Sequence, residues 1–156
     1  MAALLLALAI VSTGLYAGFM LIFQTGIMPA LARLTDEEFV PAMRRINEYV
    51  PKPVFLVVFL GVVAFPAAAL FVPVDGRTGT QKWLVLAGLV AAVANHLVTA
   101  AGNIPLNNAL AASTDQPAAA VRGAFERRWN GLHRIRTLLI LAAFGLLTAS
   151  AVVTGG

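Results

Sequence analysis

Four long stretches of the sequence contain no charged residue, and they constrain the fold more than any other feature. They cover residues 4–28, 54–71, 83–102 and 137–153, and the 11 Lys and Arg and the 7 Asp and Glu residues all lie outside them. A helix needs about 20 residues to cross a hydrocarbon core of roughly 30 Å. In that core the backbone polar groups must be satisfied within the segment, which favours helix. The sequence therefore predicts four membrane-spanning helices.

The composition agrees with a chain that is embedded in lipid. Hydrophobic residues make up 60% of it, charged residues 12%, and the mean hydropathy is +0.85. A soluble domain carries about twice that charged fraction. We expect one membrane domain, residues 1–156, in which the first span is retained and is not a cleaved signal, because no basic residue precedes it. The absence of cysteine excludes disulfides, thiolate metal sites and cysteine nucleophiles.

Basic residues are concentrated in two of the three loops. Loop two has only Arg77 and Lys82, whereas loops one and three contain Arg33, Arg44, Arg45, Lys52, Arg122, Arg127, Arg128, Arg134 and Arg136. Lys and Arg in short loops tend to stay cytoplasmic, so we expect loops one and three in the cytoplasm and both termini outside. Because these residues flank spans, anionic headgroups of the lipid bilayer explain the net charge of +4 better than nucleic acid does.

The two halves of the chain repeat the same order of motifs. The first span ends in residues 26–29 (Gly-Ile-Met-Pro) and the third in residues 102–105 (Gly-Asn-Ile-Pro). Residues 44–47 (Arg-Arg-Ile-Asn) precede the second span, and residues 127–130 (Arg-Arg-Trp-Asn) precede the fourth. We therefore predict two tandem helical hairpins related by a pseudo-two-fold axis along the membrane normal. Proline removes a backbone donor, so each helix is expected to bend or end at its Gly-x-x-Pro motif.

Both cytoplasmic loops are predicted to contain a short amphipathic helix. In loop one, Thr35 and Glu38 have the spacing of a capping box for a helix over residues 36–49, which we place at the membrane surface. Loop three contains a similar segment from Pro117 to about Arg136, expected to continue into the fourth span. The predicted fold class is thus all-α, a four-transmembrane-helix bundle with short amphipathic helices in the two cytoplasmic loops.

Polar side chains inside a membrane are expensive, so the few that occur in the spans are candidates for function. Span two has none between residues 54 and 74, and we interpret it as a scaffold. The candidates on the other helices recur at helical spacing: His96, Thr99 and Asn103 on span three, and Trp129, His133 and Arg136 on span four. If these two faces meet, they form a polar pocket. Further candidates for substrate binding are Tyr16, Gln24, Asn47, Asn107 and Asn130.

The two histidines allow more than one interpretation. An imidazole among apolar residues is more often a hydrogen-bonded structural group than a catalyst, and both roles stay open for His96 and His133. Two histidines on different helices could also ligate haem or a single metal ion. The sequence contains no Gly-rich phosphate loop, no metal-spaced carboxylates and no Ser-His-Asp order, so neither an organic cofactor nor a metal site is predicted.

Two ordered motifs resemble a known family. Residues 102–107 (Gly-Asn-Ile-Pro-Leu-Asn), followed by residues 129–136 (Trp-Asn-Gly-Leu-His-Arg-Ile-Arg), are similar to the pattern of the anthrone oxygenase-like family of small four-span membrane proteins. The first half fits the same pattern through residues 14–18, residues 26–29 and Asn47. The resemblance implies an integral protein of a bacterial inner membrane that oxygenates a polycyclic anthrone to an anthraquinone with molecular oxygen, without an established flavin or haem.

That reaction gives the candidate residues their expected roles. An anthrone has an acidic methylene group, so a base can generate an electron-rich anion that passes an electron to oxygen. His133 or His96 is the expected base, and Trp129 is expected to stack on the hydrophobic aromatic substrate. The expected donors to the oxyanion are Arg136, Asn103, Asn107 and Asn130.

Two other functions stay open at this point. The same pocket could bind or transport a hydrophobic small molecule, a quinone or haem without catalysis. The polar residues could instead only connect helices in a structural membrane subunit. Gly14 and Gly18 form a Gly-x-x-x-Gly pattern that favours close helix contact, either inside the bundle or in an oligomer.

Overall fold

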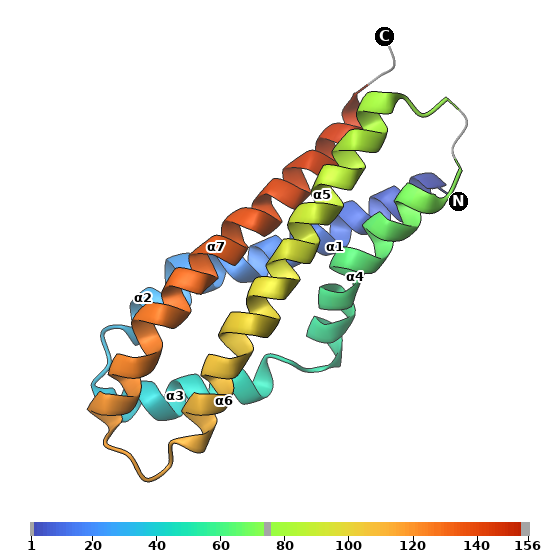
Figure 1. Cartoon of the computed structure of the whole chain (residues 1–156). Helices are drawn as coiled ribbons and strands as arrows, with labels where there is room; N and C mark the ends of the chain where they lie inside the picture. The colour runs from blue at the N-terminus through green and yellow to red at the C-terminus, as the bar shows by residue number, and fades with distance from the viewer. Residues whose placement is uncertain (1, 74–75, 154–156) are drawn as a thin grey trace.

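The structure is a bundle of long helices that run side by side (Figure 1). It is a computed structural model that describes residues 2–73 and 76–153. Every regular element in these two ranges is helical, which confirms the predicted all-α class. In chain order the helices are α1 Ala2–Ile22, α2 Met28–Leu31, α3 Asp36–Tyr49, α4 Pro53–Phe71, α5 Gly79–Val98, α6 Ile104–Ala112 and α7 Ala118–Val152. Two π-helical turns, η1 Phe23–Ile27 and η2 Thr99–Asn103, join α1 to α2 and α5 to α6.

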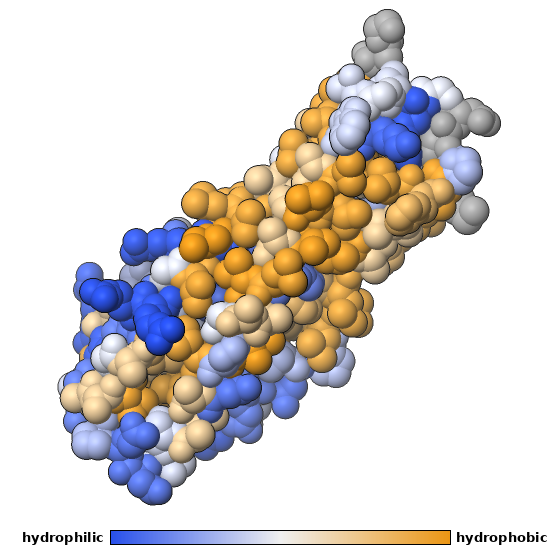
Figure 2. Space-filling model, viewed as in Figure 1, coloured by the Kyte–Doolittle hydropathy of each residue, from blue (hydrophilic) through white to orange (hydrophobic). Residues whose placement is uncertain are grey.

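Four segments are long and apolar enough to cross a membrane: Ala3–Leu31, Pro53–Phe71, Gly79–Ala112 and Ala118–Val152. The prediction of four membrane-spanning helices is therefore confirmed, and the chain is an integral membrane protein; three of the helical segments extend several residues beyond the uncharged stretches. Hydrophobic side chains cover much of the visible face, and polar ones collect at the end that carries α3 (Figure 2). With its 35 residues α7 is about 52 Å long, well beyond a hydrocarbon core of roughly 30 Å. The bundle therefore extends beyond the hydrocarbon core.

The helices pair as two tandem hairpins, as predicted. Helix α1 packs along α4 and α5 along α7, while contacts between α1 and α7 and between α4 and α5 join the hairpins. The core at this level includes Tyr16, Val62 and Ile140, each fully buried. Gly14 lies so close to the ring of Phe144 on α7 that a Cβ at this position would be 3.0 Å from it, so its close helix contact is internal.

Neither Gly-x-x-Pro motif ends its helix. Each proline follows a π-helical turn, in which a backbone N–H bonds to the carbonyl five residues earlier; in the first half the Met28 N–H donates to the Phe23 oxygen. Pro29 and Pro105 then occupy the first turn of α2 and of α6. A missing N–H is tolerated there because the wider turn already interrupts the α-helical ladder. The two π turns lie at equivalent places in the two halves, which supports the predicted repeat.

Helix α3 begins with the predicted capping box. The Thr35 hydroxyl accepts a hydrogen bond from the Glu38 N–H (3.3 Å), and the Glu38 carboxylate accepts one from the Thr35 N–H (3.0 Å). Its apolar side chains, Phe39 and Met43 among them, are buried in a separate core formed with α2, α6 and α7. The helix lies across the end of the bundle (Figure 1). Loop one therefore covers this end with a second, smaller hydrophobic core.

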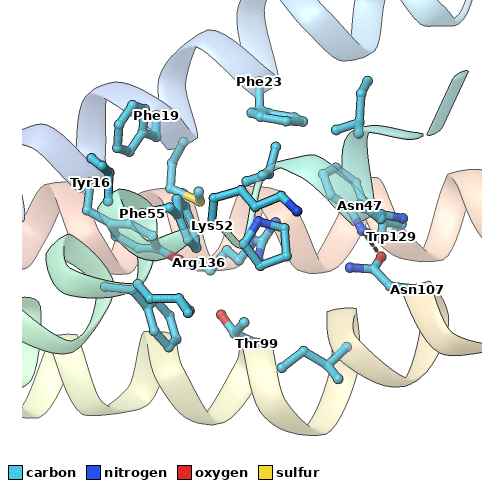
Figure 3. A pocket seen from close by; sticks show the side chains of 18 of the residues that line it. Tyr16, Phe19, Phe23, Asn47, Lys52, Phe55, Thr99, Asn107, Trp129 and Arg136 are labelled. Atoms are coloured by element: carbon cyan, nitrogen blue, oxygen red, sulfur yellow. Dashed lines mark hydrogen bonds between the residues drawn. The ribbon is translucent and has the colours of Figure 1, made fainter. Parts of the chain in front are cut away.

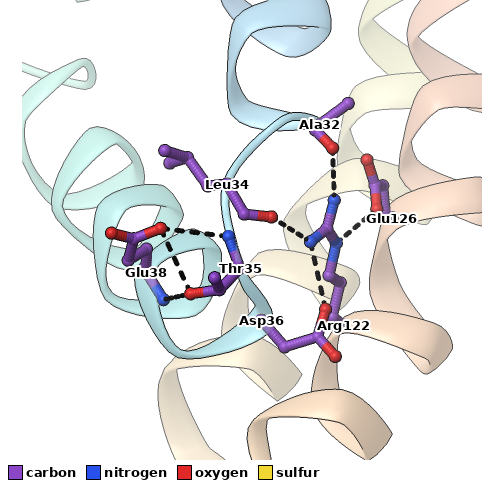
Figure 4. A network of polar contacts seen from close by, with 7 residues as sticks. All are labelled: Ala32, Leu34, Thr35, Asp36, Glu38, Arg122 and Glu126. Carbon is purple, nitrogen blue, oxygen red and sulfur yellow. Dashed lines mark hydrogen bonds and ion pairs between the residues drawn. The ribbon is translucent and has the colours of Figure 1, made fainter.

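One arginine connects the start of loop one to α7 (Figure 4). Arg122 donates to the backbone oxygens of Ala32 (3.1 Å) and Leu34 (2.8 Å). It also pairs with Asp36 (3.0 Å) and Glu126 (2.7 Å), and its side chain is 14% exposed. Because two of the acceptors are backbone oxygens, this contact fixes the path of the α2–α3 turn.

The two halves differ at the connection into their second span. In the first half α3 ends at Tyr49, and residues 50–52 form a non-helical link before α4 begins at Pro53. Pro51 and Pro53 account for this break, because proline lacks a backbone donor and disfavours helix in the residue before it. No proline occurs between residues 118 and 153, and α7 runs without a break from loop three through span four, as predicted.

Candidate functional site

A cavity of about 560 Å³ lies between the two hairpins, near the link that joins α3 to α4 (Figure 3). Its walls come from α1, the end of α3, α4, η2, α6 and α7. Six aromatic side chains line it: Tyr16, Phe19, Phe23, Phe55, Phe59 and Trp129. A cavity of this size suits a small organic molecule, and aromatic walls favour one that is flat and largely apolar.

Polar groups face the cavity at several points along its length (Figure 3). They belong to Asn47, Lys52, Thr99, Asn107, Asn108 and Arg136. The Tyr16 hydroxyl and the Asn47 amide nitrogen are buried and have no hydrogen-bond partner in the described parts of the chain. A buried polar atom without a partner is costly unless water or a ligand completes it. The cavity is therefore suited to a ligand that carries oxygen atoms.

Arg136 is the buried cation of this cavity. It is 8% exposed, and its Nε donates a hydrogen bond to Nδ1 of His133 (3.1 Å). The guanidinium carbon lies 5.2 Å from the ring centre of Trp129, in a cation–π arrangement. Over residues 2–73 and 76–153, no carboxylate lies within ion-pair distance of Arg136. A buried cation without a counter-ion is unfavourable, so the site is suited to an anionic group of a ligand.

His133 holds Arg136 in place and does not itself line the cavity. Its Nε2 lies 3.0 Å from the Met20 carbonyl oxygen, and its ring stacks on Trp129 with centroids 4.8 Å apart. Because Nε2 must carry the proton to donate to a carbonyl, the neutral ring presents the lone pair of Nδ1 to Arg136. Both ring nitrogens are therefore engaged, and the residue is 1% exposed.

His96 connects α5 to α4 and does not itself line the cavity. Its Nε2 lies 2.9 Å from the Phe59 carbonyl oxygen, and its Nδ1 lies 3.0 Å from that of Ala92. The ring stacks on Phe59 with centroids 3.9 Å apart. The structure therefore does not place His96 and His133 in a common pocket, in contrast to the expected convergence. In the part of the chain that the structure describes, no three His, Asp or Glu side chains gather as metal ligands.

Asparagines on α5, η2 and α6 hold α7 and its Trp129 in position. Asn107 Oδ1 accepts a hydrogen bond from the Trp129 indole (2.9 Å) and lines the cavity. Asn103 Nδ2 donates to the Trp129 backbone oxygen at 3.4 Å, and its Oδ1 is buried without a partner in the described ranges. Asn95 is not among the predicted site residues, and it donates to the Arg136 backbone oxygen (2.6 Å). These contacts fix the backbone of α7 at both cavity residues.

A second cavity of about 140 Å³ lies beside His133, and its lining residues are Gln24, Met28, Pro29, Ala32, Asn130, His133 and Arg134. Gln24 and Asn130, both predicted as site residues, thus border this smaller space instead of the aromatic cavity. The aromatic cavity brings together six of the predicted candidates, namely Tyr16, Asn47, Thr99, Asn107, Trp129 and Arg136.

The sequence interpretation missed the contribution of span two and of the link before it. Phe55 and Phe59 form one wall of the cavity, so the expectation that span two is only a scaffold was wrong. Lys52 borders the same cavity and had been considered only for membrane orientation. The position of Lys52 between two prolines is a sequence signal that could have found the link. Span two is apolar throughout and offers no such signal for Phe55 and Phe59.

Comparison with known proteins gives the family. Neither the search of curated proteins nor the search of solved structures found a match. The model of the anthrone oxygenase family matches residues 39–146, from α3 to most of α7. The match covers more than half of the chain and includes Trp129, His133 and Arg136. The chain therefore belongs to the anthrone oxygenase family.

Proposed function

We propose that the protein binds a flat, oxygen-bearing polycyclic aromatic and oxygenates it with molecular oxygen, as the name of its family suggests. The observation that carries the proposal is Arg136, a buried cation that borders a cavity with six aromatic side chains. An anthrone suits such a cavity because its neutral form is flat and apolar, and because loss of a methylene proton converts it into an oxyanion. The guanidinium favours the anion and so makes the methylene group more acidic.

The proposed reaction balances with O₂ as the only oxidant. Loss of one methylene proton gives a carbanion whose charge is delocalised onto the carbonyl oxygen. The anion transfers one electron to O₂, and the two radicals combine to form a C–O bond and a peroxide. A proton returns to the peroxide, the O–O bond breaks, and the second hydrogen of that carbon leaves with the hydroxyl group as water. One anthrone and one O₂ thus give one anthraquinone and one water, without an organic cofactor.

The residues around the cavity take separate roles in this proposal. Arg136 and the Tyr16 hydroxyl stabilise the oxyanion, and Trp129 stacks on the substrate rings. His133 is a positioning residue that acts through its hydrogen bond to Arg136. The lining residues in the described ranges include no carboxylate and no imidazole, so the methylene proton passes to water at the mouth of the cavity. His96 has a structural role between α4 and α5.

Oxygen uptake by the purified protein in detergent tests the proposal. An anthrone is added, and oxygen consumption and anthraquinone absorbance are followed together, with one O₂ expected per quinone formed. Arg136→Met keeps much of the apolar volume and is expected to lower kcat/KM by about 100-fold or more. The matched control is Arg134→Met, an exposed residue outside the aromatic cavity, which is expected to keep the wild-type rate. A folded Arg136→Met protein with the wild-type rate would contradict the proposal.

A second function is favoured by the hydrogen bonds of the two histidines. Because neither imidazole lines the cavity, and both are held against other protein groups, neither is placed to take a proton from a ligand there. The alternative is non-catalytic binding or transport of a hydrophobic aromatic molecule or a quinone in the same cavity. In that case an anthrone would quench tryptophan fluorescence with an affinity that depends on Arg136, and no oxygen would be consumed.

We also propose that the α3 end of the bundle faces the cytoplasm of a bacterial inner membrane. The support is the concentration of nine basic residues in loops one and three, against two in loop two. Because the chain has no cysteine, single cysteines can report on each side. In intact cells a membrane-impermeant maleimide is expected to label Thr80→Cys in loop two and not Asp115→Cys in loop three. The reverse pattern would invert the orientation.

A further inference from the structure

We propose that the natural ligand of the aromatic cavity carries a carboxylate in addition to its acidic ring oxygen, and that Lys52 binds this carboxylate. The inference rests on the proposed function, because it names the substrate class of the same cavity. The starting observation is that Lys52 borders the cavity. A role in orienting the chain within the membrane does not explain this position.

The backbone of Lys52 is held in place beside the cavity. Pro51 and Pro53 flank it, and it lies in the non-helical link that ends one helix and starts the next. Its N–H donates to the Val50 oxygen (2.8 Å), and its carbonyl oxygen accepts from the Leu56 N–H (3.0 Å). Two prolines and two hydrogen bonds restrict the backbone of this short segment. The side chain of Lys52 therefore starts from a fixed Cα position beside the cavity.

The side chain of Lys52 reaches towards the other lining residues (Figure 3). Its Nζ lies 5.1 Å from the ring centre of Tyr49, a cation–π contact at the rim. Lys52 is exposed, whereas Arg136 is buried, and among the residues that the structure describes no carboxylate lies within ion-pair distance of either. One apolar cavity therefore borders two cations and, within the described ranges, no acidic side chain. A ligand with two acidic groups would neutralise both charges.

The internal repeat shows that a lysine beside the cavity is specific to the first half. When residues 44–47 are aligned with residues 127–130, Lys52 corresponds to Ile135, which is half exposed and lines neither cavity. The basic residues that flank span four are its neighbours Arg134 and Arg136, and of these Arg136 borders the large cavity. The two cations of this cavity therefore come from different positions of the repeat.

Binding of two matched probes tests the inference. Trp83→Phe removes the exposed tryptophan, so that quenching reports on Trp129 alone. The probes are anthraquinone-2-carboxylate and its uncharged carboxamide, and the protein is held in phosphatidylcholine nanodiscs. We expect the carboxylate to bind about threefold to fivefold more tightly than the carboxamide, and Lys52→Met to abolish this preference. Lys52→Arg is expected to retain it, and Lys82→Met in loop two serves as the control that should behave as wild type.

The possible outcomes separate this inference from the proposed function. Carboxamide binding without any preference for the carboxylate, or a preference that survives Lys52→Met, would overturn the role of Lys52 and leave the proposed function standing. Failure of both probes to bind would overturn the proposed function as well. The measurement is repeated with phosphatidylglycerol in the nanodiscs. If this anionic lipid removes the preference, the partner of Lys52 is a lipid headgroup and the inference is wrong; if the preference persists, the ligand carboxylate is supported.

Discussion

The two halves of the molecule have the same order of elements but differ in the connection that leads into their second span. Each half has a long helix, a π turn, a proline and a segment of Arg-Arg-x-Asn sequence. In the first half two prolines interrupt the helix, and a cavity of about 560 Å³ lies beside the interruption. In the second half α7 continues, and the cavity at the equivalent position has only about 140 Å³. The difference shows how an interruption in one repeat can widen a cavity whose other walls, with Trp129 and Arg136, come from the second repeat.

The two cavities are related by the repeat. Several residues that line the large cavity have equivalents that line the small one: Ile104 and Met28, Asn108 and Ala32, Asn47 and Asn130, and Val50 and His133. In the same alignment Arg136 stands where the first half has Pro53. His133, the equivalent of Val50 in the link, borders the smaller cavity, and Arg136, one turn further along α7, borders the larger one.

The most damaging way to break this comparison is to give α7 the interruption of the first half. Arg134 corresponds to Pro51, and it is exposed on a continuous helix. Arg134→Pro removes a helical hydrogen bond and should lower the free energy of unfolding by about 3 kcal/mol or more. Arg134→Ala, which keeps the helix, should have little effect in the same thermal unfolding measurement in detergent. Equal stability of the two variants would mean that the continuity of α7 is not required.

A smaller effect is expected from removing the imidazole that supports the arginine. His133→Ala leaves the Arg136 Nε and the Met20 oxygen without their partner and empties space against Trp129. We expect a loss of roughly 2 kcal/mol of stability and a lower affinity for an aromatic anion. The repeat-related substitution Val50→Ala should cost less than about 1 kcal/mol. If His133→Ala unfolded at the wild-type temperature, the imidazole would not be a structural support.

The contact between the halves at the polar end can be tested with two arginines. Arg122→Met breaks a partly buried ion-pair network with two backbone acceptors and should cost about 1 kcal/mol, reduced by high salt. Arg45→Met removes only an exposed pair with Glu48, whose side chains are 73% and 59% exposed, and should leave the melting temperature unchanged. Similar values for the two variants would assign no special role to the α2–α3 turn.

The smallest effect on stability is expected for Asn47 and Asn130, which occupy equivalent positions in the two halves. The Asn47 amide nitrogen has no partner in the described chain, so Asn47→Leu should change stability by no more than about 0.5 kcal/mol. It should nevertheless weaken binding of an anthraquinone several-fold, because a donor to the ligand is lost. Asn130→Leu, its equivalent beside the small cavity, should leave this binding unchanged. Equal losses of affinity would show that the two cavities are not functionally distinct.

The features that could be predicted from the sequence are those that depend on local patterns. The lengths of the uncharged stretches predicted the four spanning helices, and the spacing of Thr35 and Glu38 predicted the start of α3. The absence of proline after residue 117 agrees with the continuity of α7. The walls of the cavity depend instead on how distant segments meet. Span two is apolar on all sides, so its pattern could not show that Phe55 and Phe59 face a space and not lipid. The hydrogen-bond partners of His96 are backbone oxygens, which no residue type reveals.

Each π turn contains one residue more than regular α-helix would use, and it therefore acts as a phase shift built into the backbone. One residue corresponds to a rotation of about 100° for everything that follows. Beyond η2 this rotation helps to decide which face of α6 carries Asn107 to the indole of Trp129. Deleting one residue within 100–103 would turn that face away while every side chain of the cavity remained present. Gain or loss of a single residue at these two points thus gives descendants of this chain a way to reshape the cavity without replacing its walls.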